Sequence, residues 1–238
     1  MKAMILAAGR GERLRPLTDR VPKPMVPIAG RPLLEYTVEW LRGHGCTDLA
    51  INLHYRPEVI REHFGDGAAF GVSIHYSLER ELLGTAGALL PCRQFFDGDT
   101  FLVMYGDNLT NLDLGAFLRA HRDWQALATM AVHHRDDVIH SGMAVVEPDG
   151  RLVAYREKPR PEEVTSHWVG AGIILFEPAV FDYIPPDGPS DLSRDVMPAL
   201  VAANVPLYAY KMCEKLRWAD SWQDYQELER LAAAGELL

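Results

Sequence analysis

Residues 3–31 read AMILAAGRGERLRPLTDRVPKPMVPIAGR, and this stretch decides how the first part of the chain folds. Residues 3–8 form an apolar run with the length of a buried strand. A loop follows that is rich in glycine and proline, with three arginines between positions 10 and 15 and with Lys23. Glycine lets backbone N–H groups approach an anion closely, and arginine and lysine supply the opposite charge. The stretch therefore predicts a strand that ends in a phosphate-binding loop.

The loop does not match the two most familiar phosphate-binding patterns. Gly9 and Gly11 fit the first two positions of GxGxxG, but Leu14 stands at the third. The P-loop pattern GxxxxGK[ST] is absent, and no acidic residue closes a following strand at the dinucleotide spacing. These departures argue against a nicotinamide-dependent dehydrogenase. A solvated basic loop stiffened by prolines is the alternative interpretation of the same residues.

The rhythm of the remaining chain predicts the fold class. Up to about residue 132, short apolar runs alternate with helical patterns, which is typical of a mainly parallel sheet covered by helices. Residues 142–159, GMAVVEPDGRLVAYREKP, then predict a hairpin with PDG as its turn. We therefore expect a Rossmann-like α/β fold with a mostly parallel, mixed sheet flanked by helices.

Composition excludes several classes of partner. The chain has 238 residues and a formal net charge of −9, which disfavours nonspecific binding to nucleic acid or to an anionic membrane. The three cysteines lack CxxC spacing, and their odd number argues against a disulfide framework. No stretch has the length of a secretory signal or of a membrane span. We expect a cytoplasmic protein. The nine histidines show no metal-ligand spacing, so structural or solvent roles are expected for them.

Residues 6–36, LAAGRGERLRPLTDRVPKPMVPIAGRPLLEY, resemble the signature of the sugar-1-phosphate nucleotidyltransferases. That signature is a strand, then G-x-G-x-R-L-x-P-L-T, then P-K-P, then a helix, and every position is present. The resemblance implies a fold of the nucleotide-diphospho-sugar transferase type. It also implies one domain over 1–238, with a nucleotide-binding part over about 1–132 and a sugar-binding part over 133–238. Larger relatives add a C-terminal β-helix, whose hexapeptide repeat is not found here; a homodimer is compatible with the sequence.

The same resemblance implies roles for residues of the loop. Arg13 would hold the leaving pyrophosphate, and Lys23 would neutralise the reacting phosphates. The remaining positions would line the nucleotide with backbone and small side chains. These are Leu6, Ala7, Ala8, Gly9 and Gly11.

Two aspartates are the predicted ligands of Mg²⁺. Asp107 follows the buried run FLVMYG, at the carboxyl end of a strand, where ligands of open α/β sheets bind. The alternative is that Asp107 caps the next turn. In the resembling family a second Asp follows a Trp late in the chain, which Asp220 matches. The usual glycine two residues later is Trp222 here, and Asp220 or Ser221 could instead cap the terminal helix.

The sugar-side residues are also implied by the resemblance. In the family an E-K-P tripeptide binds sugar hydroxyls through its Glu and the sugar phosphate through its Lys, which here are Glu157 and Lys158. Gly142, Gly170 and Gly172 would let the backbone approach the sugar. A surface charge pair before a proline turn, and plain strand packing, are the alternative interpretations.

Gly84, Thr85 and Ala86, in LLGTAGALL, resemble the family's nucleobase loop. This form is closest to guanylyltransferases for mannose or heptose phosphates. We therefore expect transfer of a nucleotidyl group from GTP to a mannose- or heptose-type sugar 1-phosphate, with Mg²⁺ as cofactor. The alternatives are a uridylyl- or other nucleotidyltransferase for another sugar 1-phosphate, such as N-acetylmuramate 1-phosphate, or a non-catalytic binding module. A nucleotide-sugar glycosyltransferase would lack the triphosphate loop.

Overall fold

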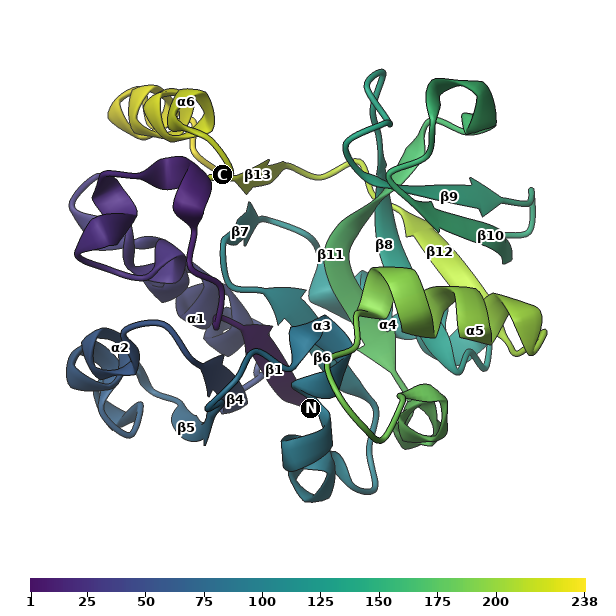
Figure 1. The fold of residues 1–238 in the computed structure, drawn as a ribbon, viewed down its shortest axis with the longest axis horizontal. Coiled ribbons are helices and arrows are strands. Elements are labelled where there is room, and N and C mark those ends of the chain that lie inside the picture. Colours follow the sequence, from purple (N-terminus) through teal and green to yellow (C-terminus); the bar gives the residue numbers. More distant parts are fainter. The chain divides into compact units, whose positions relative to one another are not determined.

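The computed structural model describes residues 1–238 and divides them into two compact units. The first unit comprises Met1–Leu82, Met104–Leu112 and Glu214–Leu238, and the second comprises Leu83–Val103 and Asp113–Cys213. Both units combine strands with helices (Figure 1). No helix of either unit has the length and apolar character needed to cross a membrane. The division into a nucleotide-binding and a sugar-binding part stays a prediction.

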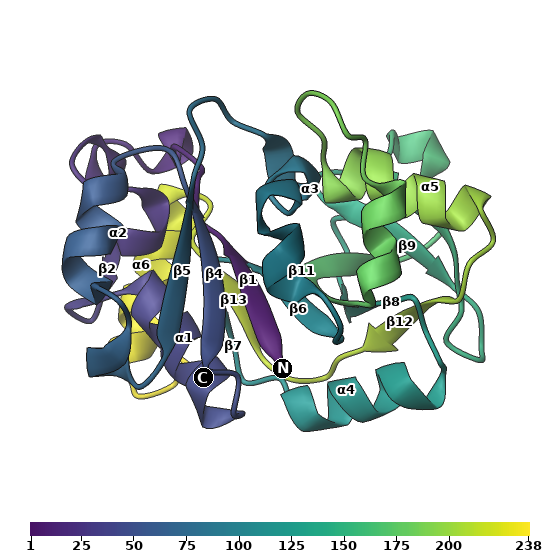
Figure 2. The same ribbon diagram turned by 90° about the horizontal axis from the view of Figure 1, so that it is seen from below.

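The first unit is built on three parallel strands, which lie side by side in Figure 2. Their order is β1, β4, β5, and β1 and β4 are almost wholly buried because both faces carry apolar side chains. Parallel neighbours need a crossover, and α1 and α2 supply it. The bounds are β1 (Lys2–Leu6), α1 (Leu33–Gly43), β4 (Asp48–Leu53), α2 (Pro57–Phe64) and β5 (Ser73–Leu78).

The loop after β1 and the chain's last segment complete the first unit. The loop contains three 3-10 turns and the short antiparallel pair β2 and β3. Near the C-terminus, β13 pairs antiparallel with β7, and α6 follows. The bounds are Glu12–Leu14, Leu17–Asp19 and Lys23–Met25 for the turns, then β2 (Pro27–Ile28), β3 (Arg31–Pro32), β7 (Asn108–Thr110), β13 (Leu216–Trp218) and α6 (Trp222–Ala233).

The second unit carries a mixed sheet in the order β10, β9, β11, β8, β12. Strands β8 and β12 are parallel and the other pairs are antiparallel, with α4 against β8 and β12 and α5 against β10. The predicted hairpin over 142–159 is confirmed as β9 and β10. The bounds are α4 (Leu114–Asp123), β8 (Ala128–His134), β9 (Gly142–Val146), β10 (Leu152–Glu157), β11 (Trp168–Phe176), α5 (Met197–Ala202) and β12 (Leu207–Lys211). Strand β6 (Phe101–Tyr105) runs across the boundary between the units.

Two helical segments of the second unit are irregular. The short α3 (Gly84–Gly87) is followed by a 3-10 helix over Leu90–Phe96. The segment after Asp191 begins as a π-helix over Leu192–Val196 before α5. Pro91 and Pro198 lie at the first turns of the later segments. Because proline lacks an N–H and fits only the first turn of a helix, each proline marks a break from the preceding turn.

Candidate active site

A buried polar chain fixes the start of the loop after β1. The N–H of Ala7 donates to Oδ1 of Asn52 at 2.8 Å, and Nδ2 of Asn52 donates to Oε1 of Glu79 at 2.8 Å. Asn52 and Glu79 are 3 % and 5 % exposed, so these bonds satisfy polar groups that water does not reach. Leu6 lies at the end of β1, Ala8 is buried, and Gly9 is the first exposed backbone of the loop. No motif in the sequence pointed to Asn52 or Glu79.

Gly11 allows the loop to fold back upon itself. Its φ is +63°, and a Cβ at this position would lie 2.7 Å from Cβ of Lys23 and 3.0 Å from Cγ2 of Thr18. The hydroxyl of Thr18 donates to the carbonyl of Gly11 at 2.8 Å. The second glycine of the motif is therefore required because Lys23 packs directly against it.

Four of the predicted residues meet in one charged cluster. Nζ of Lys23 forms ion pairs with the carboxylates of both Asp107 and Asp220. Nη2 of Arg13 lies 3.1 Å from Oδ1 of Asp220. The Lys23 side chain is 14 % exposed, whereas that of Arg13 is 74 % exposed. The cluster thus has a largely buried ammonium between two carboxylates and an exposed guanidinium at its solvent side.

Burial and charge act in opposite directions on this cluster. Burial favours the neutral form of Lys23, but the carboxylates of Asp107 and Asp220 outweigh it and raise the Lys23 pKa above its ordinary value. Burial likewise disfavours the charged form of Asp220, but Lys23 and Arg13 overcome it and lower the Asp220 pKa. Lys23 is therefore a cation and Asp220 an anion at neutral pH.

Strands β7 and β13 bring the two aspartates to the same ammonium. In their antiparallel pairing Trp218 lies opposite Asn108, so Asp107 immediately before β7 and Asp220 just after β13 fall at the same end of the ladder. The N-cap of α6 is Ser221, whose hydroxyl accepts from the N–H of Asp224 in a capping box. The alternative of Asp220 as the cap is therefore wrong, and its side chain turns to Lys23 and Arg13.

An apolar cluster holds the charged residues in place. Its buried members come from the loop, from α1, from β7 and from the C-terminal segment. Three of them are sequence neighbours of the charged groups: Leu14 follows Arg13, Leu109 is near Asp107, and Ala219 precedes Asp220. All seven buried members are at most 2 % exposed: Leu14, Val26, Ile28, Leu33, Leu109, Ala219 and Leu228.

In the second unit, Tyr155 lies against two of the predicted glycines. A Cβ at Gly142 would lie 1.8 Å from the Tyr155 hydroxyl oxygen and 2.9 Å from Oε2 of Glu157, and a Cβ at Gly170 would lie 3.0 Å from the same hydroxyl. Any larger residue at 142 would displace the Tyr155 ring and the Glu157 carboxylate, because these side chains of the neighbouring strand occupy the space. The two glycines thus make room for Tyr155 and Glu157, a role the sequence analysis did not foresee.

The Glu157 carboxylate is half-buried, and burial raises its pKa although Lys158 and Arg194 oppose the shift. The folded chain therefore holds this proton more tightly than the unfolded chain, so the contribution of Glu157 to stability is lost as pH rises through the folded pKa. We expect Glu157→Gln to raise the melting temperature at pH 7, because the amide carries no charge to desolvate. The gain should shrink below the unfolded pKa of about 4.3.

Thermal unfolding from pH 7 to pH 4 checks this expectation. Glu163→Gln is a control of opposite sign, since Arg160 and Arg156 lower the pKa of Glu163 to about 2; this variant should melt lower at pH 7. A Glu157→Gln protein that melts below the wild type at pH 7 would show that the charge of Glu157 stabilises the fold.

The predicted nucleobase loop packs on residues 190–192. The Thr85 hydroxyl donates to Oδ1 of Asp191 at 3.0 Å and accepts from the N–H of Leu192 at 2.8 Å. The N–H of Ala86 donates to the carbonyl of Ser190 at 2.9 Å. Asp191 is thus a further residue of this loop's surroundings, and no sequence pattern pointed to it.

We expect Gly84→Ala to destabilise the chain by about 2–4 kcal/mol. Gly84 has φ +77°, and a Cβ there would lie 2.3 Å from the carbonyl oxygen of Ser190, a backbone atom that cannot rotate away. Gly188→Ala is the matched control, because its φ is +76° and nothing lies within 4 Å of its Cβ position. It should cost about 1 kcal/mol from backbone conformation alone. Chemical denaturation measures both, and equal losses would disprove the steric argument.

The structure thus gathers the predicted residues into three sets. Arg13, Lys23, Asp107 and Asp220 form the charged cluster, Gly142, Glu157 and Gly170 surround Tyr155, and Gly84, Thr85 and Ala86 pack on 190–192. Lys158 and Gly172 take no part in the contacts that define these sets. Lys158 is exposed. Gly172 has φ +67° and lies where the pairing register of β11 shifts.

Comparisons with known proteins identify the family of this chain. A family model described as nucleotidyl transferase matches residues 2–235. A UTP–glucose-1-phosphate uridylyltransferase of Synechocystis is 40 % identical over 92 % of the chain, and a mannose-1-phosphate guanylyltransferase of Mycobacterium tuberculosis is 35 % identical over 87 % of it. The chain spans 60 % and 58 % of the lengths of these two relatives.

A solved structure of a similar protein has the same fold. A proposed glucose-1-phosphate thymidylyltransferase from Bacillus anthracis, in complex with a sucrose, superposes with a TM-score of 0.88 at 26 % identity, covering 98 % of this chain and 95 % of that one. The α/β fold class and the family resemblance predicted from the sequence are confirmed.

Proposed function

Since the chain belongs to the nucleotidyl transferase family, we propose that it transfers a nucleotidyl group from a nucleoside triphosphate to a sugar 1-phosphate. One observation carries the proposal. The ammonium of Lys23 is held between the carboxylates of Asp107 and Asp220, with Arg13 beside Asp220, and both cations belong to the glycine-rich loop after β1. A polyanionic substrate needs cationic groups of this kind, and a divalent ion needs the carboxylates.

The reaction forms one bond and breaks one at the same phosphorus. An oxygen of the sugar 1-phosphate attacks the α-phosphorus of the triphosphate, the bond to the β-phosphate oxygen breaks, and pyrophosphate leaves with the electron pair. The nucleophile is already an anion at neutral pH, so no strong general base is needed. The residues of this chain act by holding charge: the amides around Gly9 and Gly11 bind the triphosphate, and Arg13 and Lys23 stabilise the leaving pyrophosphate.

The family generally uses a divalent metal, and Asp107 and Asp220 have the donor set that Mg²⁺ prefers. Both offer carboxylate oxygens, and both already surround a single positive charge, the Lys23 ammonium. Mg²⁺ bound there would supply positive charge to the phosphates of both substrates. We propose that Lys23, whose side chain is long and flexible, turns from the carboxylates to the leaving phosphates when substrates bind.

We propose that residues of the second unit recognise the sugar phosphate. The Glu157 carboxylate accepts hydrogen bonds from sugar hydroxyls, and Lys158 contacts the sugar phosphate. The half-buried position of Glu157 supports this role, because a partly desolvated carboxylate gains most from hydroxyl donors.

Two pairs of nucleoside triphosphate and sugar 1-phosphate are candidate substrates. GTP with a mannose- or heptose-type 1-phosphate is the prediction from Gly84, Thr85 and Ala86, and the name of the Mycobacterium tuberculosis relative supports it. UTP with glucose 1-phosphate is the second candidate, supported by the name of the Synechocystis relative, which is 40 % identical. A cytoplasmic location and a homodimer stay predictions.

Pyrophosphate release tests the proposal. The purified chain is incubated with Mg²⁺, each nucleoside triphosphate and a panel of sugar 1-phosphates. We expect release that requires both substrates with at least one pair. GTP preference would support the interpretation of residues 84–86, and UTP preference would replace it while leaving the reaction class intact. No release with any pair would favour a non-catalytic binding module.

A further inference from the structure

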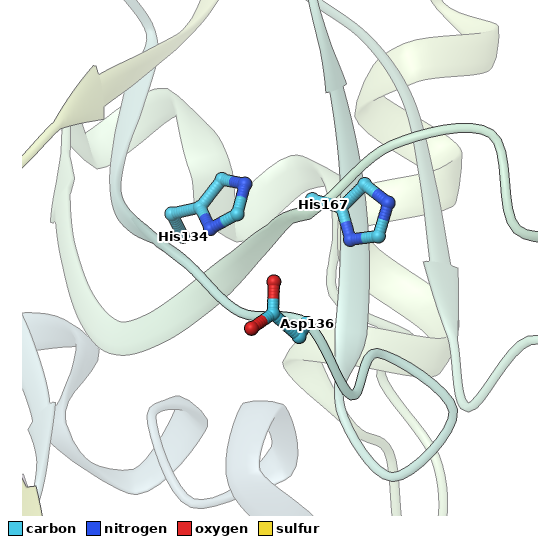
Figure 3. Close-up of side chains that lie close together, drawn as sticks. All are labelled: His134, Asp136 and His167. Carbon is cyan, nitrogen blue, oxygen red and sulfur yellow. The ribbon is translucent and has the colours of Figure 1, made fainter.

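A cluster of potential metal ligands lies in the second unit, and none of its members belongs to the three sets of site residues. Its members are His134, Asp136 and His167. Each offers one ligand atom, and these atoms all lie within 4.8 Å of one another. Figure 3 shows the Asp136 carboxylate pointing to the space between the two imidazole rings. We propose that this His₂Asp cluster, on the surface of the second unit, binds a divalent transition-metal ion such as Zn²⁺.

The backbone holds the ligands at a fixed separation. His134 is the last residue of β8 and pairs with Trp168, the first residue of β11, so His167 directly precedes a strand that is already in register. The N–H of Arg135 donates to the carbonyl of His167 at 2.9 Å. His134 thus lies on a paired strand, His167 directly precedes one, and Asp136 lies in the bend that follows β8.

The hydrogen bond of His167 holds its ring beside the other two residues of the cluster. Nδ1 lies 3.1 Å from the carbonyl oxygen of Arg135, and since a carbonyl only accepts, Nδ1 carries the proton when no ion is bound. Figure 3 shows that Nδ1 is also the ring nitrogen on the side of Asp136, whereas Nε2 lies on the far side of the ring. A metal ion therefore binds at Nδ1 in place of this hydrogen bond, and Nε2 then carries the proton.

The neighbouring charges are compatible with a cation. The two imidazole rings stack with centroids 5.5 Å apart and planes 22° apart. Arg135 stands between two of the ligands in sequence, but its Nη1 donates to Oγ of Ser141 at 3.1 Å. The one formal charge that the cluster itself contributes is the carboxylate of Asp136.

The donor set selects the class of ion. Imidazole nitrogens suit Zn²⁺, Cu²⁺ and Ni²⁺, whereas Mg²⁺ prefers oxygen ligands throughout. Tetrahedral Zn²⁺ has ligand bonds of about 2.0–2.1 Å, which place ligand atoms about 3.4 Å apart. All three side chains are exposed, so small rotations of their side chains can close the remaining gap. A water completes the coordination on the open side.

The position of the cluster indicates what the ion does. His134 and His167 flank residues 135–166, an excursion of the chain that contains β9 and β10 and therefore Gly142 and Glu157. An ion bound at its base ties the end of β8 to the start of β11. Since an ion that binds only the folded chain stabilises it, Zn²⁺ should raise the melting temperature of this unit.

Zn²⁺ titration of the full, tag-free chain tests the proposal without substrates, so its outcome does not depend on the proposed reaction. Excess Mg²⁺ is present to occupy carboxylate sites, and a chromophoric chelator competes for Zn²⁺. We expect one tight equivalent and a higher melting temperature in the wild type. In His134→Ala and His167→Ala, Zn²⁺ affinity should fall about 10–100-fold or more, and the melting shift should disappear.

Two further variants and one spectrum make the test specific. His140→Ala removes an exposed histidine outside the cluster, and this variant should still bind one equivalent of Zn²⁺. Asp107→Asn should also still bind one equivalent of Zn²⁺. Co²⁺ should give visible absorption bands of a nitrogen-ligated site in the wild type and not in His167→Ala. Zn²⁺ affinities that are equal in the wild type and both cluster variants would overturn the proposal, and so would an equal loss in His140→Ala. Circular dichroism verifies that the exposed substitutions leave the fold intact.

Discussion

Asp107→Ala should lower turnover about 10²–10³-fold, which is roughly 3–4 kcal/mol of transition-state stabilisation, while the chain remains folded. The Asp107 side chain is 18 % exposed and faces the Lys23 ammonium. Its removal eliminates one of two carboxylates that would hold Mg²⁺ and leaves the phosphates of both substrates less well neutralised. The fold should persist because Asp220 still pairs with Lys23 and the apolar cluster around Leu109 is unchanged.

The measurement is pyrophosphate release with the preferred substrate pair, at saturating substrates and over a range of Mg²⁺ concentrations. Asp107→Asn keeps the size of the side chain and should lose activity to a similar degree, because an amide is a weaker ligand for Mg²⁺ than a carboxylate. Asp48→Asn, at the exposed start of β4 in the same unit, should leave turnover unchanged. Near-normal turnover in Asp107→Ala would refute the assigned role.

Lys23→Met should also lower turnover about 10²–10³-fold, and in addition it should destabilise the apo chain. Removing one member of a buried ion pair costs about 3–5 kcal/mol, and solvent around the half-exposed Asp220 reduces this to about 2 kcal/mol. The loss arises because the carboxylates of Asp107 and Asp220 would then face each other with only Arg13 nearby. The Gly11 backbone would remain packed against residue 23.

A second measurement separates catalysis from stability in Lys23→Met. Because the variant lacks the ammonium between its carboxylates, Mg²⁺ should raise its melting temperature by more than that of the wild type. Lys215→Met, at an exposed lysine of the same unit, should change neither turnover nor the response to Mg²⁺. A Lys23→Met protein with wild-type turnover, or with no extra stabilisation by Mg²⁺, would contradict the assigned position of this lysine between two metal ligands.

The charged cluster also affects how the stability of the fold changes at acidic pH. Lys23 and Arg13 lower the pKa of Asp220, so this carboxylate stabilises the fold above its unfolded pKa and the contribution is lost as pH falls through the folded value. Glu157 acts in the opposite sense, because burial raises its pKa. Protonation therefore affects the fold in opposite ways at these two carboxylates. Lys23 and Arg13 stabilise the charged form of Asp220, whereas burial disfavours the charged form of Glu157.

Features that depend on local chemistry could be predicted from the amino-acid sequence. The apolar run before Gly9 predicts a buried strand, the alternation of apolar and helical segments predicts the α/β class, and PDG predicts the hairpin of β9 and β10. The loop signature from Leu6 to Tyr36 resembles that of the sugar-1-phosphate nucleotidyltransferases, and the family model confirms this resemblance. Each of these predictions rests on residues close together in the chain, where backbone and side-chain preferences act directly.

Contacts between distant residues could not be predicted in this way, because they form only in the folded chain. Lys23 and Asp220 are 197 positions apart, and the pairing of β7 with β13 brings the second carboxylate to the ammonium. The packing of Gly84 on Ser190, the hydrogen bond from Ala7 to Asn52, and the cluster of His134 with His167 likewise join separate segments. Such contacts depend on strand register and on burial of apolar side chains from the whole unit, and neither is encoded in the spacing of any one segment.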